Sequence, residues 1–352
     1  MSMQPTGVFS QTYARDMAIF RTWKQAAGLA CFLLALLAVP AVLGPRYVAI
    51  ANIMLITAVV VIGLQITTGI AGQVNLGQSA FMGVGAYTAA ALSAGQGWPF
   101  LLTLPVAGIV AAVFGSLFGL AAVRIRGFYL ALTTIAAQFI FVFAILNLPP
   151  AWFGAAQGLR VDSATIFGFQ FNTDNRMYYL ILAVTAIMTV GAYGIVRSRH
   201  GRAFVAVRDD DLAAGFTGVN VVRTKATAFF VGAFYAGVGG ALWAYYIRFI
   251  AADQFNLFNS VYYMGMIIVG GLGSIAGAFV GVFLIRAAQE ILTSVGPSIA
   301  EALPALGSSV VFASVNVFLG AAIAFMLIVQ PRGVMHRWEV LKRSYRIWPY
   351  PH

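Results

Sequence analysis

The sequence predicts an all-α membrane protein that crosses the bilayer about ten times. Only 9% of its 352 residues are charged and 61% are hydrophobic, whereas about a quarter of the residues in a soluble domain are charged. A soluble enzyme of this length would need far more polar surface, so that class is excluded. Long segments without Asp, Glu, Lys or Arg are the second observation, because each such charge costs about 2.5 to 3.5 kcal/mol at the centre of a membrane helix.

The uncharged segments give the positions of the expected helices. One helix fits between Lys24 and Arg46, and the segment from Arg46 to Arg124 has room for three helices of about 20 residues each. Further apolar runs cover residues 127–147, 178–196, 226–246, 257–285 and 309–330.

The run that begins at residue 257 is too long for one helix, and Gly270, Gly271 and Gly273 interrupt it. We therefore expect two helices there, which brings the total to ten. The second of them carries Arg286 and Glu290, four residues apart on one helix face. This spacing favours an ion pair that anchors the helix end near the outer surface over a proton relay.

The distribution of Lys and Arg supports ten spans with both termini in the cytoplasm, since cytoplasmic segments of membrane proteins are enriched in these residues. The expected outer segments hold Arg46, Arg160, Arg176 and Arg248. The expected cytoplasmic segments hold sixteen basic residues: Arg15, Arg21, Lys24, Arg124, Arg126, Arg197, Arg199, Arg202, Arg208, Arg223, Lys225, Arg332, Arg337, Lys342, Arg343 and Arg346. The net charge of +11 therefore reflects the enrichment of Lys and Arg in the expected cytoplasmic segments, and we expect no nucleic-acid partner.

Several kinds of chemistry are missing from the sequence. No Gly-Lys pair occurs, so there is no P-loop for ATP. His200, His336 and His352 stand apart from one another, and Cys31 is the only cysteine. We therefore expect no bound metal, no cofactor and no enzymatic activity in this chain.

Glycines also mark a close helix contact. Gly273, Gly277 and Gly281 recur at every fourth position, which predicts a glycine-lined helix face that another helix approaches closely.

Two loops differ in composition from ordinary connections between membrane helices. Residues 67–79 are uncharged but rich in glycine and polar side chains, namely Gly72, Gln73, Asn75, Gln78 and Ser79. Backbone that leaves helical geometry at membrane depth must line a cavity or be buried in protein. The composition fits a polar path or gate and a short cytoplasmic turn about equally.

The second loop, residues 197–225, is the longest basic segment. Asp209, Asp210 and Asp211 suit the N-terminus of a short helix, residues 212–216 suit its body, and Gly218 suits its end. Small residues at positions 213–215 leave a surface that another protein can approach, although a solvated linker helix fits the pattern too.

At these loops the sequence resembles the permease subunits of branched-chain amino acid ABC importers. The resemblance rests on residues 69–87, on the loop from Gly201 through Arg208–Asp211 to Lys225, on Gly270–Gly277, and on Gln330–Gly333. The four motifs occur in the family's order between about residues 50 and 335. The longer permease of the heterodimeric pair is the closer likeness.

The resemblance implies a complex in the bacterial inner membrane. Two permease subunits would form the path, two ATPase subunits would use ATP and Mg²⁺ on the cytoplasmic face, and a periplasmic binding protein would deliver the substrate. Residues 1–24 would be a cytoplasmic N-terminal segment, residues 25–330 the transmembrane permease domain, and residues 331–352 a cytoplasmic tail.

The resemblance also implies roles for particular residues. The coupling helix that contacts the ATPase would involve Gly201, Arg202, Arg208, Asp209, Asp210, Asp211, Ala213, Ala214 and Gly218, and the translocation path would involve Gly72, Gln73, Asn75, Gln78 and Ser79. The chain departs from the family where Asp209–Asp211 replace Glu-Asp-Glu and where Gly215 replaces a larger, often basic residue. A urea or short-amide importer is the rival within the family, and a stand-alone channel or secondary transporter is the rival outside it.

Overall fold

A computed structural model describes the chain at residues 23–121, 127–149, 154, 157–166, 168–302, 317, 320–321, 323–329 and 333–347. The expected N-terminal segment lies outside these residues except for positions 23 and 24, and so do Arg124, Arg126 and positions 330–332 of the final motif.

The described residues form a helical bundle. Its helices are α2 (Trp23–Val42), α3 (Pro45–Leu64), α4 (Gln78–Gln96), α5 (Phe100–Ala121), α6 (Phe128–Asn147), α8 (Asp174–Arg197), α9 (Arg199–Asp209), α10 (Asp211–Phe216), α11 (Val221–Ile247), α12 (Leu257–Gly270), α13 (Ile275–Ala302) and α15 (Gly333–Ile347). A π-helix, η1 (Gln65–Ile70), continues α3, and a 3-10 turn, η3 (Ala252–Gln254), precedes α12.

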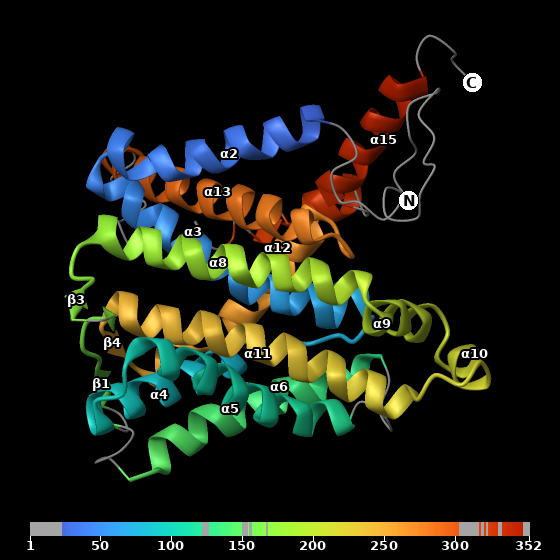
Figure 1. The fold of residues 1–352 in the computed structure, drawn as a ribbon, viewed down its shortest axis with the longest axis horizontal. Helices are drawn as coiled ribbons and strands as arrows, with labels where there is room; N and C mark the ends of the chain where they lie inside the picture. Colours follow the sequence, from blue (N-terminus) through green and yellow to red (C-terminus); the bar gives the residue numbers. More distant parts are fainter. Residues whose placement is uncertain are drawn as a thin grey trace.

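Four strands of two residues each add small antiparallel pairs to the bundle. The strand β1 (Leu159–Arg160) pairs with β4 (Phe249–Ile250), and β2 (Thr165–Ile166) pairs with β3 (Phe169–Gln170). The strands β1, β3 and β4 lie at one end of the bundle, whereas α9, α10 and α15 lie at the opposite end (Figure 1).

Helix boundaries follow local chemistry. Pro45 stands at the first position of α3, where its missing N–H costs nothing. Gly97 ends α4 in the left-handed conformation, with φ of 65°. The side chain of Asn220 caps α11 by accepting a hydrogen bond from the backbone N–H of Arg223.

Every expected helix position up to residue 302 holds a helix. Within the described residues, six helical segments are long and apolar enough to cross a membrane: Pro45–Ile70, Phe100–Ala121, Tyr129–Asn147, Asp174–Arg197, Val221–Ile247 and Ile275–Ser294. The expected break near Gly270 is confirmed, because α12 ends at Gly270 and α13 begins at Ile275. The expected span 309–330 falls largely outside the described residues, although residues 323–329 are helical.

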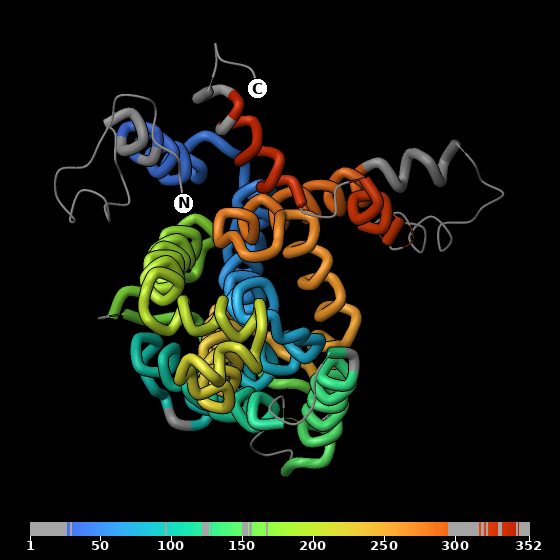
Figure 2. Tube along the Cα trace, turned by 90° about the vertical axis from the view of Figure 1, so that its right-hand side faces the viewer, coloured from blue at the N-terminus to red at the C-terminus, as the bar shows by residue number. Residues whose placement is uncertain are grey.

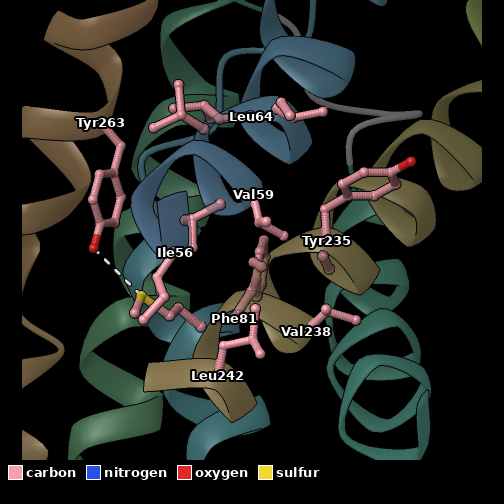
Figure 3. Close-up of a cluster of buried hydrophobic side chains, with 14 of the residues drawn as sticks. Ile56, Val59, Leu64, Phe81, Tyr235, Val238, Leu242 and Tyr263 are labelled. Atoms are coloured by element: carbon pink, nitrogen blue, oxygen red, sulfur yellow. Dashed lines mark hydrogen bonds between the residues drawn. The ribbon is translucent and has the colours of Figure 1, made fainter. Parts of the chain in front are cut away.

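The helix α11 is the centre of the bundle and packs against α3, α4 and α5. Figure 3 shows this core, in which the labelled side chains are Ile56, Val59 and Leu64 of α3, Phe81 of α4, Tyr235, Val238 and Leu242 of α11, and Tyr263 of α12. The hydroxyl of Tyr263 donates to the sulfur of Met82, 3.3 Å away. In the end-on view, α2 lies at the rim of the bundle beside α8 (Figure 2).

The expected ion pair between Arg286 and Glu290 is wrong. The carboxylate of Glu290 instead pairs with Arg46 of α3, with 2.6 Å between Nη2 and Oε1. Arg286 donates to Gln289 and Thr57. An (i, i+4) spacing permits a pair on one helix, but α3 brings a competing guanidinium to the same carboxylate.

Candidate functional site

The polar segment 65–79 begins where α3 changes into the π-helix η1. Gln65 and Thr67 of η1 are fully buried. The hydroxyl of Thr67 donates to the carbonyls of Gly63 and Leu64, at 3.1 and 3.2 Å. Single turns of π-helix inside α-helices are frequent at functional sites, and this one positions the residues that follow.

After η1 the chain runs back along α3 without helical structure. The side chain of Gln78, the first residue of α4, donates to the carbonyl of Val60 at 2.9 Å. Ten helical residues separate Val60 from Ile70, which corresponds to about 15 Å along the axis. Residues 71–77 therefore return by about that distance, beside the helix from which they came.

The polar side chains of this returning segment are buried in protein. Asn75, Gln78 and Ser79 are 0% exposed. Asn75 donates to Oε1 of Gln78 at 2.9 Å, and the backbone N–H of Ser79 donates to the hydroxyl of Ser260 in α12, also at 2.9 Å. These side chains are thus enclosed by protein, whereas the choice between a polar path and a short cytoplasmic turn, and the role of these residues in the path, stay predictions.

Gln73 and Gly72 lie nearer the loop 197–225. The side chain of Gln73 is 7% exposed and donates to the carbonyl of Ala71 at 3.0 Å. Gly72 is exposed and has φ of +69°, a conformation that favours glycine. A Cβ at this position would lie 2.5 Å from Cγ of Arg208, so the glycine allows the loop to touch the segment.

The loop 197–225 folds into two helices, α9 and α10. The predicted capped helix is confirmed as α10, because the carboxylate of Asp210 accepts from the backbone N–H groups of Leu212 and Ala213, at 2.9 and 3.1 Å. Gly218 follows the helix with φ of +88°. The helix α9 was not expected; it includes Arg202, whose guanidinium donates to the carbonyl of Arg197 at 3.4 Å.

Gly201 and Ala214 lie at the buried sides of these two helices. Gly201 is buried beside the carbonyls of Ile195 and Val196, so the end of α8 and the start of α9 approach closely. Ala214 is 4% exposed, whereas Ala213 is exposed. The outer surface of α10 is apolar, since Leu212 and Phe216 are 62% and 92% exposed.

Arg208 connects α9 to the polar segment. Its Nη1 donates to the carbonyl of Gly69 at 3.4 Å, and its Nη2 pairs with Asp209 at 2.8 Å. The neighbouring acid thus holds the guanidinium in position beside η1.

Lys225 provides a second connection, between α10 and α11. Its ammonium group lies 3.1 Å from the carboxylate of Asp211, and the two side chains are 4% and 15% exposed. This ion pair therefore joins α10 to α11, the core helix of the bundle.

The glycine-rich motif, Gly270–Gly277, also contacts η1. Gln65 donates to the carbonyls of Gly271 and Ser274, at 2.9 and 3.0 Å. A Cβ on Gly69 would lie 2.7 Å from the backbone nitrogen of Gly273. Gly333, the described residue of the final motif, packs against Gly271. The first three motifs of the resemblance therefore meet around η1, and Gly333 packs beside the third of them.

The three glycines expected on one helix face divide between two places. Gly277 and Gly281 lie on α13 and face α12, where a Cβ on Gly281 would meet the carbonyl of Met266. Gly273 lies instead in the turn before α13, with φ of +84°. The four-residue spacing of the glycines therefore continues to Gly273, which lies outside the helix α13.

Two buried residues of the site were missed by the sequence reasoning. Gln65 lies in an apolar run, and a lone amide there was the available signal, because an intramembrane polar group needs a partner. Lys225 was counted as an ordinary cytoplasmic cation, and no local pattern distinguishes it from its exposed neighbours.

Comparison with known proteins agrees with this architecture. Residues 46–327 match the family model described as the branched-chain amino acid transport system permease component. The chain is 29% identical over 294 residues to the high-affinity branched-chain amino acid transport system permease protein LivM of Escherichia coli, which covers 77% of this chain and 69% of LivM.

Two other permeases are also similar. The chain is 27% identical to the high-affinity branched-chain amino acid transport system permease protein LivH of Escherichia coli, over 81% of this chain and 92% of LivH. It is 30% identical to the autoinducer 2 import system permease protein LsrC of an Enterobacter strain, over 32% of this chain and 34% of LsrC. No solved structure matches. Because the family model covers most of the chain, the chain belongs to the branched-chain amino acid transport system permease family, as a multi-pass membrane protein and an ABC importer permease.

Proposed function

We propose that this chain is one of two permease subunits of an importer in a bacterial inner membrane, and that it carries branched-chain amino acids by ATP-driven alternating access. Its ten spans would place both termini in the cytoplasm. Two partner ATPase subunits would bind ATP and Mg²⁺, and a periplasmic binding protein would deliver the substrate. The names of LivM and LivH support the substrate class.

The apolar outer surface of α10 is the observation that carries the proposal. Leu212 and Phe216 are 62% and 92% exposed on a helix of six residues that protrudes from the end of the bundle (Figure 1). This helix is too short to cross a membrane. A partner protein that covers these two side chains would remove them from water, and the ATPase subunit is the partner that the proposal requires.

The contacts behind α10 suggest how movement would reach the path. Closure of the ATPase dimer would push on α10 near Ala213. The ion pair between Asp211 and Lys225 would transmit this movement to α11, and Arg208 would transmit it to η1 and the segment 71–77. This segment would act as the gate at the cytoplasmic side of the path, and its change of position would switch the path from outside-open to inside-open.

A matched pair of substitutions at Phe216 tests the docking role. In the reconstituted complex, Phe216→Asp is expected to reduce the stimulation of ATP hydrolysis by the loaded binding protein at least about tenfold, because a charge would have to be buried in the ATPase groove. Phe216→Leu keeps an apolar side chain and is expected to retain most of the stimulation.

The substitutions have little effect on the fold of the chain itself, since Phe216 is 92% exposed and surface changes usually stay within about 0.5 kcal/mol. Ala213→Trp on the same helix is expected to act like Phe216→Asp by steric exclusion. Normal stimulation in both Phe216→Asp and Ala213→Trp would contradict the docking role of α10.

A further inference from the structure

Arg286 is a cation near the middle of the membrane span. It lies eleven residues after Ile275, the start of the span Ile275–Ser294, which is about 16 Å along the helix. Its Nη2 donates to the hydroxyl of Thr57 at 3.1 Å. Thr57 in turn lies twelve residues into the span Pro45–Ile70. Both helices therefore place the guanidinium about halfway through a hydrocarbon core of about 30 Å.

The charge of Arg286 is held by neutral groups. Nη1 donates to Oε1 of Gln289 at 3.2 Å, and Nη2 donates to Thr57. The nearest acid along α13 is Glu290, which pairs with Arg46 instead. Within the part of the chain that the structure describes, Arg286 forms no ion pair. Its Nε is buried and has no hydrogen-bond partner.

Such an arrangement needs a physical reason. Charged residues inside membrane spans pair with opposite charges or mark substrate pathways, because an uncompensated charge there is costly. The residue as a whole is partly exposed, and Nη1 and Nη2 each carry a second N–H besides the one that they donate to Gln289 or Thr57. The surroundings are thus polar and uncharged, which suits a site that receives an anion transiently.

We propose that Arg286 binds the α-carboxylate of the amino acid as it passes the middle of the membrane. This inference rests on the proposed function and sharpens the substrate class. A guanidinium forms two parallel hydrogen bonds with a carboxylate, and the second N–H of Nη1 and of Nη2 would supply them. Thr57 and Gln289 fix the orientation of the side chain before the substrate arrives. A urea or neutral amide has no charge that would compensate the cation, so the site favours amino acids over these rivals.

The test uses the complete transporter in proteoliposomes with ATP and the loaded binding protein. Uptake of radiolabelled leucine and ATP hydrolysis are measured together for the wild type, Arg286→Gln and Arg286→Lys. Loss of a hydrogen-bonded charge contact is expected to reduce uptake about ten- to a hundredfold in Arg286→Gln. Stimulated ATP hydrolysis is expected to stay within about twofold of the wild type, because α10 and its contacts are unchanged.

Arg176→Gln is the matched control. Arg176 is an exposed arginine near the outer end of α8 that lies over the ring of Phe169, and it takes no part in the proposed site. Its uptake is expected to equal that of the wild type. Arg286→Lys keeps the positive charge but lacks the planar guanidinium that can form two parallel hydrogen bonds. Uptake is therefore expected to fall about tenfold, with normal subunit assembly.

Three outcomes would overturn the inference. If Arg286→Gln or Arg286→Lys takes up leucine at the rate of Arg176→Gln, the carboxylate contact does not exist. If the subunits of both Arg286 variants fail to assemble, Arg286 is a structural contact, for instance with an acid of the second permease subunit. A wild-type complex that moves urea but not leucine refutes the proposed function itself, and this result is distinct from the first two because it does not depend on any variant.

Discussion

Removal of the negative charge at Asp211 is expected to release α10 from the core. The ammonium group of Lys225 lies 3.1 Å from the carboxylate of Asp211, and both side chains are largely buried. With an effective dielectric constant of about 20, two unit charges at this separation attract each other by about 5 kcal/mol. Removing one partner of a buried pair costs about 3 to 5 kcal/mol, because the remaining charge loses the attraction of its counter-charge.

We therefore expect Asp211→Asn to lower the free energy of unfolding by about 3 kcal/mol. The asparagine has almost the same shape, so the loss reports the charge rather than the packing. The purified chain in detergent is unfolded with denaturant, and the same variant is assayed for stimulated ATP hydrolysis in the complex. Both the stability and the stimulation are expected to fall.

A double-mutant cycle with Lys225→Met separates the pair from its surroundings. Asp211→Asn and Lys225→Met are each expected to be destabilising, and the double variant is expected to be less so than the sum of the two. Effects that add without any coupling energy, or a change below about 0.5 kcal/mol for Asp211→Asn, would refute the view that this ion pair joins α10 to α11.

Two further predictions concern glycines at close contacts. Gly72→Val is expected to reduce stimulated ATP hydrolysis but not its basal rate, because a left-handed conformation costs about 1 to 2 kcal/mol in other residues and the new side chain displaces Arg208; equal stimulation in variant and wild type would contradict this. Gly281→Leu is expected to lower the melting temperature by several degrees, because overpacking costs about 1 to 3 kcal/mol and a side chain at this position would meet the carbonyl of Met266. Gly194→Leu on α8 is the control, because a side chain there would point into open space. Equal melting temperatures for the two leucine variants would show that α12 and α13 do not depend on the glycine contact.

The positions of the helices could be predicted because charge is excluded from membrane spans. The runs 127–147 and 226–246 became α6 and α11 with boundaries that differ by at most five residues. The small helix α10 could be predicted as well, since capping by Asp210 is a local interaction between neighbouring residues. Features that depend on composition or on a few adjacent residues were therefore accessible from the sequence.

Contacts between distant segments were not accessible in the same way. Glu290 pairs with Arg46, 244 positions away, rather than with the arginine on its own helix. The convergence of the first three motifs around η1 also depends on how α3, α9 and α13 pack. Lys225 illustrates the limit, because its burial follows from the position of α10 above α11, which no periodicity in the sequence encodes.

The central claim, transport driven by partner ATPases, is tested most directly by leucine uptake into proteoliposomes that contain the complete complex. The account predicts accumulation of leucine above its external concentration when ATP and the loaded binding protein are both supplied, and no accumulation when either is omitted. Uptake of leucine by this chain alone, at a rate that ATP and the partner subunits do not change, would contradict it.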